Sequence, residues 1–437
     1  MPSTKQIARE ILHQTLASID IPAVMERKLV IDRSRLVLSS AIIELSAIAR
    51  VVVIAIGKAA HAMANGLCSI LPDGISFTGV VAAPTSPAAP IPDLQYFVSG
   101  HPLPDIESLR AAEAILEVLR TCDKHTLVFF LLSGGGSALV ELPLNPALSL
   151  EDVQAIYRAL VTCGAPIDAM NTVRRHLSAV KGGRLSLAAT SAQKITLAVT
   201  DVPLGKEAAL ASGPTLPDPT HVADVQRILK EYDLPKRFPL PLRRWLEAEL
   251  MPETPKPGHE AFANACFEVL LGLDDLFHAA HHAAEALGYS CFCDNSTDDW
   301  PVGQAAEYLL AQLEVWQSEN PKQRVAVVAD GEVSSPVTGK GIGGRNSAFV
   351  LACVEKIAGR KITVLSAGTD GIDGNSFAAG AVADGETLAR ASELGLDPRA
   401  SFRESDAYTF FAKLDDAVIT GPTGNNLRDL RILLAEP

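Results

Sequence analysis

Leu127-Val128-Phe129-Phe130-Leu131-Leu132-Ser133-Gly134-Gly135-Gly136-Ser137 is the stretch that decides the fold of this chain. Its first six residues are a continuous apolar run of strand length, and three glycines between two serines follow it. A continuously apolar strand is typical of a parallel sheet that helices cover on both faces, because a half-exposed strand alternates. A glycine-rich turn directly after such a strand points several N–H groups at one spot and so predicts an anion site. A tight turn with a purely structural role is the alternative.

The same pattern recurs along the chain, where short β-branched or aromatic runs end at Gly, Asp or Ser and alanine-rich helical stretches follow. This alternation predicts an α/β protein with right-handed crossovers between parallel strands. The polar, proline-rich stretch 252–260 cannot continue a helix and has an α/β stretch on either side, so we expect it to be a linker. The predicted domains are residues 1–251, with a mostly parallel sheet and helices on both faces, and a smaller α/β domain, 261–437. The clearest predicted strands are 51–56, 77–83, 127–132, 195–200, 325–330, 362–366 and 417–420.

Composition excludes several classes of protein. The chain has 437 residues, is 48% apolar and carries a net charge of −13, which argues against a disordered chain and against binding to nucleic acid or anionic membranes. The longest aliphatic runs are too short to cross a bilayer, and the N-terminus reads as an amphipathic helix rather than a signal peptide. Seven scattered cysteines without a C-x-x-C pair disfavour a structural zinc site or a disulfide framework. We expect a cytoplasmic protein with reduced cysteines, whose sequence leaves open whether it forms a homo-oligomer.

Three further features of the first half are candidates for binding an anion or a metal. Lys58 follows a predicted strand and is placed to reach a phosphate, although a surface lysine at a helix start has the same spacing. The segment 171–183 reads as one helix in which Arg174, Ser178 and Lys181 share a face. Asp201 ends another strand, where a carboxylate can ligate Mg²⁺, accept a hydroxyl proton or cap a turn.

The second half offers weaker signals. Residues 339–344 match G-x-G-x-x-G, but eight residues separate them from the preceding strand, which disfavours a dinucleotide site. What remains is a flexible loop that delivers Arg345 and Asn346 at a helix start, or a plain surface loop. Asp370 and Asp373 follow a strand and offer a cation site or an ordinary Asp-Gly turn. In the helical stretch 278–285, the spacing of metal ligands is found for His278, His281, His282 and Glu285. No cysteine ligand is evident, so we expect these histidines to lie in the core or on the surface.

Taken in order, these motifs resemble the glycerate 2-kinase family with a C-terminal MOFRL domain, some members of which are named hydroxypyruvate reductase. The match runs from about Ile7 to Leu434, and its specificity lies in the order of nine modest motifs. They begin at Gly57, Gly100, Ser133, Asn171, Thr200, Ala211, Gly343, Ser366 and Gly421.

The resemblance implies a Rossmann-like domain followed by a MOFRL-type domain, with the active site in the cleft between them. It implies ATP and Mg²⁺, and phosphorylation of D-glycerate, a small-molecule substrate, at the 2-hydroxyl. Carried over by motif, it implies three roles for the residues of this sequence. The catalytic residues would be Lys58, Asp201 and Arg345; the cofactor-binding residues would be Ser133, Gly134, Gly135, Gly136, Ser137, Lys181, Gly343, Gly344 and Asn346; and the substrate-binding residues would be Lys58, Arg174, Arg345 and Asp370, with Asp201 as base or metal ligand.

This chain departs from the family pattern at residues 203–207, 347–348 and 375–377, where the family usually has acidic or amide residues. The departures bear on the metal arrangement and on the identity of the acceptor. Two other functions therefore stay open at this stage. One is an NAD(P)H-dependent hydroxypyruvate reductase, and the other is a non-catalytic anion-binding module on the same fold.

Overall fold

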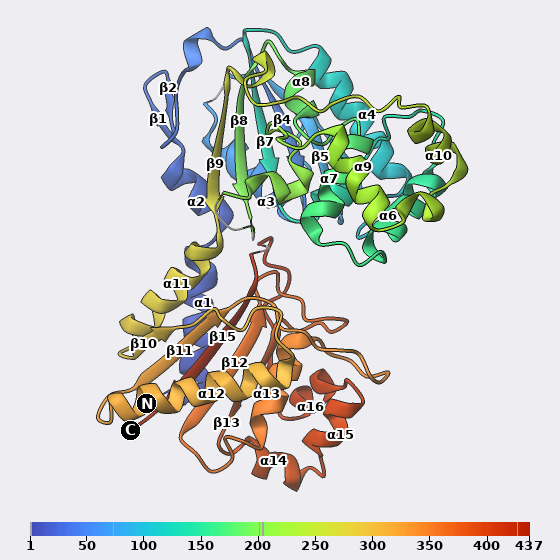
Figure 1. Cartoon of the computed structure of the whole chain (residues 1–437). Helices are drawn as coiled ribbons and strands as arrows, with labels where there is room; N and C mark the ends of the chain where they lie inside the picture. The colour runs from blue at the N-terminus through green and yellow to red at the C-terminus, as the bar shows by residue number, and fades with distance from the viewer. Residues whose placement is uncertain (1, 73, 201, 203–204, 426) are drawn as a thin grey trace. The chain divides into compact units, whose positions relative to one another are not determined.

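The apolar runs of the first half form a six-stranded sheet in the order β6-β5-β4-β7-β8-β9 (Figure 1). The neighbours from β6 to β8 are all paired in parallel. Every residue of Val51–Ile56 and Leu127–Leu132 is at most 1% exposed, so helices and loops cover both faces of this sheet. The predicted mostly parallel α/β architecture is confirmed. The strands are β4 (Arg50–Ile56), β5 (Phe77–Ala83), β6 (Leu94–Val98), β7 (Thr126–Leu132), β8 (Gln193–Val199) and β9 (Ala265–Leu271).

This computed structural model describes the chain except residues 1, 73, 201, 203–204 and 426, and it separates two compact units. The first unit, Ile21–Leu270, contains the parallel sheet and a small antiparallel sheet of β1 (Val30–Asp32), β2 (Arg35–Val37) and β3 (Ile42–Glu44). Helix α4 begins after Asp105, whose carboxylate caps it by accepting a hydrogen bond from the Ser108 N–H at 2.9 Å. The helices are α2 (Ile21–Lys28), α3 (Ala60–Ile70), α4 (Ile106–Arg120), α5 (Gly136–Leu139), α6 (Leu150–Val161), α7 (Ile167–Leu177), α8 (Arg184–Ala188), α9 (Val222–Glu231) and α10 (Leu240–Glu247).

The second unit contains a mixed six-stranded sheet in the order β10-β11-β15-β12-β13-β14. Its central strand, β15, comes from the end of the chain and is antiparallel to both β11 and β12. The strands are β10 (Ser290–Cys293), β11 (Val325–Asp330), β12 (Ile362–Gly368), β13 (Gly380–Asp384), β14 (Ala417–Val418) and β15 (Asp429–Ala435). The helices are α1 (Thr4–Ser18), α11 (Leu273–Ala286), α12 (Val302–Glu319), α13 (Arg345–Val354), α14 (Thr387–Glu393), α15 (Pro398–Arg403) and α16 (Ala407–Lys413).

Helix α1 belongs to the second unit, which comprises Met1–Asp20 and Leu271–Pro437. Ile7, Ile11 and Leu12 bury its apolar face, and the helix contacts α11 and the strands β12, β13 and β15. Lys5 adds an ion pair of 2.8 Å with Asp416. The compact units therefore differ from the expected division at 1–251 and 261–437, because the first helix packs on a sheet formed by residues distant in sequence.

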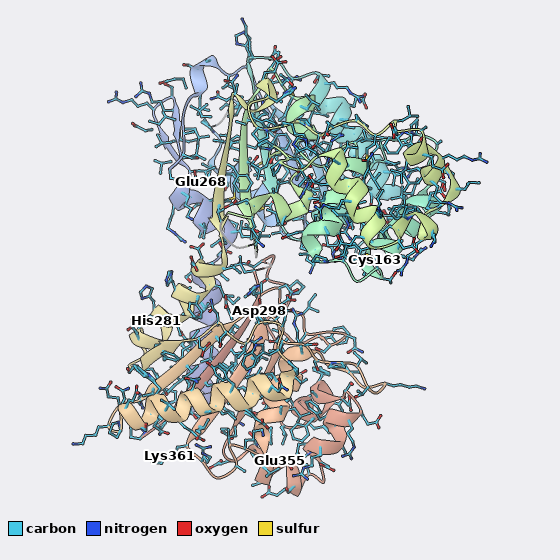
Figure 2. All side chains as sticks on the ribbon, viewed as in Figure 1. Cys163, Glu268, His281, Asp298, Glu355 and Lys361 are labelled. Atoms are coloured by element: carbon cyan, nitrogen blue, oxygen red, sulfur yellow. The ribbon has the colours of Figure 1, made fainter. Side chains whose placement is uncertain are left out.

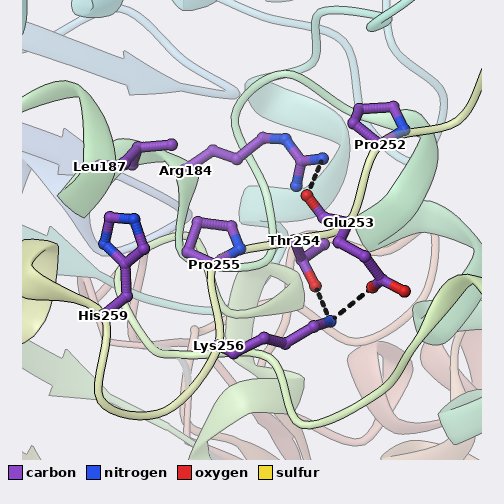
Figure 3. A pocket seen from close by; sticks show the side chains of 8 residues that line it. All are labelled: Arg184, Leu187, Pro252, Glu253, Thr254, Pro255, Lys256 and His259. Atoms are coloured by element: carbon purple, nitrogen blue, oxygen red, sulfur yellow. Dashed lines mark hydrogen bonds and ion pairs between the residues drawn. The ribbon is translucent and has the colours of Figure 1, made fainter.

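The stretch 252–260 is attached to the first unit, and the boundary of that unit falls at Leu270. The Asp218 N–H donates to Pro255 O at 3.0 Å, and Thr254 Oγ1 donates to Asp218 Oδ2 at 3.1 Å. After this stretch the chain enters β9, which carries Glu268 (Figure 2). The Glu268 carboxylate accepts a hydrogen bond from Ser40 Oγ at 2.9 Å. The stretch also lines a pocket of about 520 Å³, formed by Arg184, Leu187, Pro252, Glu253, Thr254, Pro255, Lys256 and His259 (Figure 3).

Within the described residues, no helix combines the length and the apolar character that crossing a bilayer requires.

Candidate active site

The parallel pairing of β4 and β7 brings two predicted motifs together at the carboxyl edge of the first sheet. The Lys58 N–H donates to Gly134 O at 3.0 Å, and the Ala59 N–H donates to Ser133 Oγ at 3.0 Å. Gly57 has a φ of 130°, and a Cβ at this position would overlap Ser133. Glycine is therefore required at residue 57, and the exposed Lys58 side chain starts beside the glycine loop.

The loop of Gly134, Gly135, Gly136 and Ser137 presents a row of open N–H groups. In the described part of the chain, these four N–H groups donate to no acceptor. Gly135 has a φ of 85°, a left-handed conformation that turns the chain into the short helix α5. Gly134, Gly135 and Ser137 are only partly buried, so the row is accessible to a ligand. Unpaired N–H groups on a partly exposed glycine turn fit an anion such as a phosphate.

His101 packs against the glycine loop, a position that the sequence analysis did not assign. A Cβ on Gly135 would lie 3.2 Å from His101 Cδ2 and 3.6 Å from Lys58 Cγ, so both side chains border the loop. Burial, and then the charge of Lys58, lower the pKa of the His101 imidazole, which keeps this side chain neutral at pH 7. The motif Gly100–Asp105 marked this segment in the sequence, but nothing in it indicated that the histidine meets the loop.

Arg174 reaches the same edge through a chain of polar contacts. Ser137 Oγ lies 2.8 Å from Ser212 Oγ, and Ser212 Oγ donates to Asn171 Oδ1 at 3.2 Å. Arg174 Nη1 donates to Asn171 Oδ1 at 3.3 Å, and its guanidinium lies 4.9 Å from the ring centre of Tyr157. The structure therefore connects Arg174 with Ser137 of the glycine loop through Ser212 and Asn171.

Lys181 is placed differently from the prediction. Helix α7 ends at Leu177, and Ala179 donates to Leu142 O at 2.7 Å, so the segment after the helix is extended and Lys181 does not share a helical face with Arg174. The Lys181 ammonium is 1% exposed and lies 2.7 Å from Glu141 Oε2. Burial lowers the pKa of Lys181, and the carboxylate of Glu141 opposes this shift. The predicted helical face is wrong, and the Lys181 charge is paired inside the protein, so its nucleotide-binding role stays a prediction that this contact does not favour.

Asp201, the predicted base or metal ligand, lies outside the described residues. The described residue Thr200 directly follows β8, at the carboxyl edge of the same parallel sheet.

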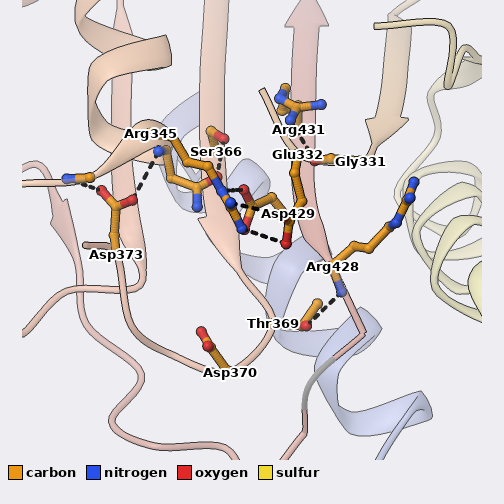
Figure 4. A network of polar contacts seen from close by, with 12 residues as sticks. Gly331, Glu332, Arg345, Ser366, Thr369, Asp370, Asp373, Arg428, Asp429 and Arg431 are labelled. Carbon is orange, nitrogen blue, oxygen red and sulfur yellow. Dashed lines mark hydrogen bonds and ion pairs between the residues drawn. The ribbon is translucent and has the colours of Figure 1, made fainter. Parts of the chain in front are cut away.

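Arg345 begins α13 in the second unit and is held by two carboxylates (Figure 4). Its Nε pairs with Asp429, and its Nη2 lies 2.6 Å from Glu332 Oε1. The Asp429 side chain is 5% exposed, whereas that of Glu332 is 46% exposed. Although burial opposes the charged form, Asp429 and Glu332 hold the pKa of the Arg345 guanidinium above its usual value. The Arg345 guanidinium is therefore fixed on one side by the buried Asp429 and bordered on the other by the exposed Glu332.

The helix start beside Arg345 already contains an anion of the protein itself. The Asp373 carboxylate accepts hydrogen bonds from the N–H groups of Gly344, Asn346 and Ser347 at 3.1, 2.9 and 2.8 Å. The Gly343 N–H donates to Asn375 Oδ1 at 2.8 Å. The N–H groups of Gly343, Gly344 and Asn346, which the resemblance assigns to a cofactor, are thus used inside the unit, and their cofactor-binding role stays a prediction.

Asn346 and Asp370 are the two remaining predicted site residues of the second unit. The Asn346 side chain accepts a hydrogen bond of 2.6 Å from Ser366 Oγ and is 2% exposed. Asp370, predicted to bind substrate, follows β12 in a turn where its carboxylate accepts from the Ile372 N–H at 3.0 Å. Figure 4 shows the Asp370 carboxylate apart from the ion pairs of Arg345.

We expect Lys181→Met to lower the free energy of unfolding by about 3–5 kcal/mol, because it leaves Glu141 charged and buried without its cation. Adding Glu141→Gln should recover a large part of this loss, since a neutral amide replaces the carboxylate. Urea denaturation of both variants measures the effect. A fully stable Lys181→Met protein with weakened ATP binding would contradict the structural role of Lys181.

The comparisons with known proteins cover both units. Residues 7–247 match a family described as a domain of unknown function (DUF4147), and residues 325–429 match the MOFRL family. The chain is 33% identical to D-glycerate 2-kinase of Thermotoga maritima over 386 residues, which is 88% of this chain and 90% of that protein. It is 35% identical over 442 residues to an Agrobacterium vitis protein whose name suggests a hydroxypyruvate reductase, covering 99% and 94% of the two chains.

A crystal structure of glycerate kinase from Thermotoga maritima has a TM-score of 0.85 with this chain at 30% identity, covering 99% of each chain. A Pyrococcus horikoshii protein of known structure has a TM-score of 0.82 at 29% identity, covering 100% of this chain and 99% of its own. The ordered motifs, the two sheets and these matches agree: the chain belongs to the glycerate 2-kinase family, with a DUF4147 domain and a MOFRL domain.

Proposed function

We propose that this protein transfers the γ-phosphoryl group of ATP to the 2-hydroxyl of D-glycerate, giving 2-phosphoglycerate and ADP. The observation that carries the proposal is the row of open N–H groups at Gly134–Ser137 beside the exposed Lys58. Membership of the glycerate 2-kinase family identifies the chain as a phosphotransferase and gives the acceptor class. We also propose a cytoplasmic location, which the seven scattered cysteines without a disulfide framework support.

In this reaction the 2-hydroxyl oxygen forms a bond to the γ-phosphorus, and the bond from that phosphorus to the β–γ bridging oxygen breaks. Such a transfer requires mainly positioning and stabilisation of negative charge. The glycine loop supplies N–H donors, Lys58 supplies a point charge, and Arg174 adds a planar cation at the same edge. We assign Asp201 to accept the proton of the acceptor hydroxyl or to hold the metal.

Mg²⁺ fits the donor atoms near the glycine loop. Ser137 Oγ, Ser212 Oγ and Asn171 Oδ1 form a chain of hard oxygen atoms with separations of 2.8 and 3.2 Å, and Asp201 would add a carboxylate. When bound, Mg²⁺ neutralises charge on the transferring phosphates.

Arg345 is proposed to bind the substrate carboxylate or a phosphate through its planar fork. Asp429 is buried and fixes the guanidinium, whereas Glu332 is exposed and is the partner that an incoming anion would replace. The same exchange would not work on the Asp429 side, because an expelled carboxylate would stay buried without a cation.

The loop 339–344 resembles a dinucleotide fingerprint, but its packing argues against the reductase function. A Cβ on Gly339 or Gly341 would overlap Glu404 or Asp406, so these glycines serve close packing within the unit. Asp373 also occupies the helix N-terminus where a pyrophosphate would bind.

The direct test is incubation with ATP, Mg²⁺ and D-glycerate, with 2-phosphoglycerate and 3-phosphoglycerate scored separately. We expect 2-phosphoglycerate and one ADP for each product formed, and no oxidation of NADH or NADPH with hydroxypyruvate. Phosphorylation of related hydroxy acids but not of D-glycerate would place the altered turns at the acceptor site. If ATP raises the melting temperature without any turnover, the protein is a binding module and not a kinase.

We expect Lys58→Ala to lower turnover roughly 100- to 1,000-fold, because a positive charge is lost where negative charge develops. Its melting temperature should stay near that of the wild type, since the side chain is exposed. Lys124→Ala removes an exposed lysine from the opposite end of β7 and should keep full activity. Activity within a few-fold of the wild type in Lys58→Ala would refute the assigned role.

Arg345→Ala should lose turnover and also stability, by about 1–3 kcal/mol, because Asp429 loses its hydrogen-bonded cation. The double variant Arg345→Ala with Asp429→Asn should regain stability but not activity. Steady-state kinetics and urea denaturation on both proteins separate these effects. Recovery of turnover in the double variant would mean that Arg345 acts only on folding.

A further inference from the structure

Two thiol sulfurs and one imidazole nitrogen converge at the edge strand of the second sheet, on residues that the proposed kinase chemistry does not use. Cys291 and Cys293 are two residues apart on β10, so their side chains lie on one face of the strand. Helix α11 contacts β10 and β11 and brings His281 to the same place (Figure 2). His281 Nδ1 lies 3.2 Å from Cys293 Sγ, and one donor atom of each of the three residues lies within 4.8 Å of the others.

The second ring nitrogen of His281 has a carboxylate partner. His281 Nε2 lies 3.2 Å from Glu285 Oε1, one helical turn further along α11. A histidine that ligates a metal commonly donates its other N–H to a carboxylate, which fixes the tautomer and the orientation of the ring. This contact leaves Nδ1, the nitrogen beside Cys293, as the atom with a lone pair for a ligand.

The separations also match what one ion requires. Bonds from Zn²⁺ to thiolate and imidazole are about 2.3 and 2.0–2.1 Å, so two donors on one tetrahedral ion lie roughly 3.5–3.8 Å apart. Small side-chain rotations bring the three atoms from within 4.8 Å to this range. All three residues are partly exposed, so an ion can enter from solvent without opening the core.

We propose that His281, Cys291 and Cys293 form a binding site for one thiophilic divalent cation, of which Zn²⁺ is the ion that fits best. Two thiolates and one imidazole suit Zn²⁺ and disfavour the hard Mg²⁺, which takes oxygen ligands. Three protein ligands leave a fourth position for water or an external ligand. The site lies on one sheet edge and shares no residue with the proposed kinase chemistry, so the two proposals can fail separately.

The test uses the full-length protein, stripped with a chelator under reducing conditions and titrated with Co²⁺ as an optical probe. We expect thiolate-to-cobalt absorption in the near ultraviolet that saturates at one ion per chain, and its loss when one equivalent of Zn²⁺ is added. No thiolate absorption at equimolar Co²⁺ would overturn the proposal.

Variants identify the ligands. Cys291→Ser, Cys293→Ser and His281→Gln should each weaken Zn²⁺ binding at least roughly 100-fold, and Glu285→Gln roughly 10- to 100-fold. Cys122→Ser, a partly buried cysteine of the other unit, should bind like the wild type. Circular dichroism of the metal-free proteins checks that each is folded, and His281→Gln tests the site without removing a thiol. Unchanged cobalt spectra in both Cys293→Ser and His281→Gln would overturn the assignment.

Discussion

The candidate active site depends on one junction between two parallel strands. Where β7 ends, the Ser133 N–H donates to Ile56 O at 2.9 Å, and its hydroxyl oxygen accepts from the Ala59 N–H. The junction closes because Gly57 has no side chain, and any Cβ there would overlap Ser133. Both strands then leave the sheet at fixed positions, so Lys58 and the open N–H groups of the glycine loop are held together by main-chain geometry. The packed strands behind them provide the rigidity, since every residue of the two apolar runs is buried.

The charges near the predicted motifs fall into two groups. Some are buried together with their partners: Asp373 accepts hydrogen bonds from the N–H groups at the start of α13, and Lys181 is buried against Glu141. Others are accessible, as with Lys58, which is exposed, and Arg345, which borders the exposed Glu332. A buried pair cannot release one partner to a ligand without leaving the other charge unpaired. Accessibility, rather than charge or glycine content, therefore separates the candidate ligand-binding residues from the structural ones.

This distinction also explains how far the sequence could predict the molecule. Continuous apolar runs predicted the parallel strands, because burial on both faces leaves a local signature. Strand β15 has no such signature, since Asp429 and Arg431 interrupt its apolar residues while the fold buries both. The packing of α1 on the second sheet and the meeting of Lys181 with Glu141 depend on contacts between residues far apart in the chain. Composition and spacing indicate the secondary structure that a segment forms, but not which distant segment it packs against.

Strand β15 shows how the second unit places Arg345, the arginine proposed to bind the substrate. Asp429 and Arg431 are two residues apart on this strand, so their side chains lie on one face of the sheet. Arg431 is fully buried and donates to Asp330 O at 3.1 Å and to Gly331 O at 2.6 Å, which fixes the main chain where β11 ends. Burial lowers the pKa of Arg431, but a guanidinium stays charged in proteins. Glu332 follows directly from this fixed main chain, and Asp429 binds Arg345 from the other side. One central strand thus positions both carboxylates that hold Arg345, which explains why a mixed strand with two charges occupies the middle of the sheet.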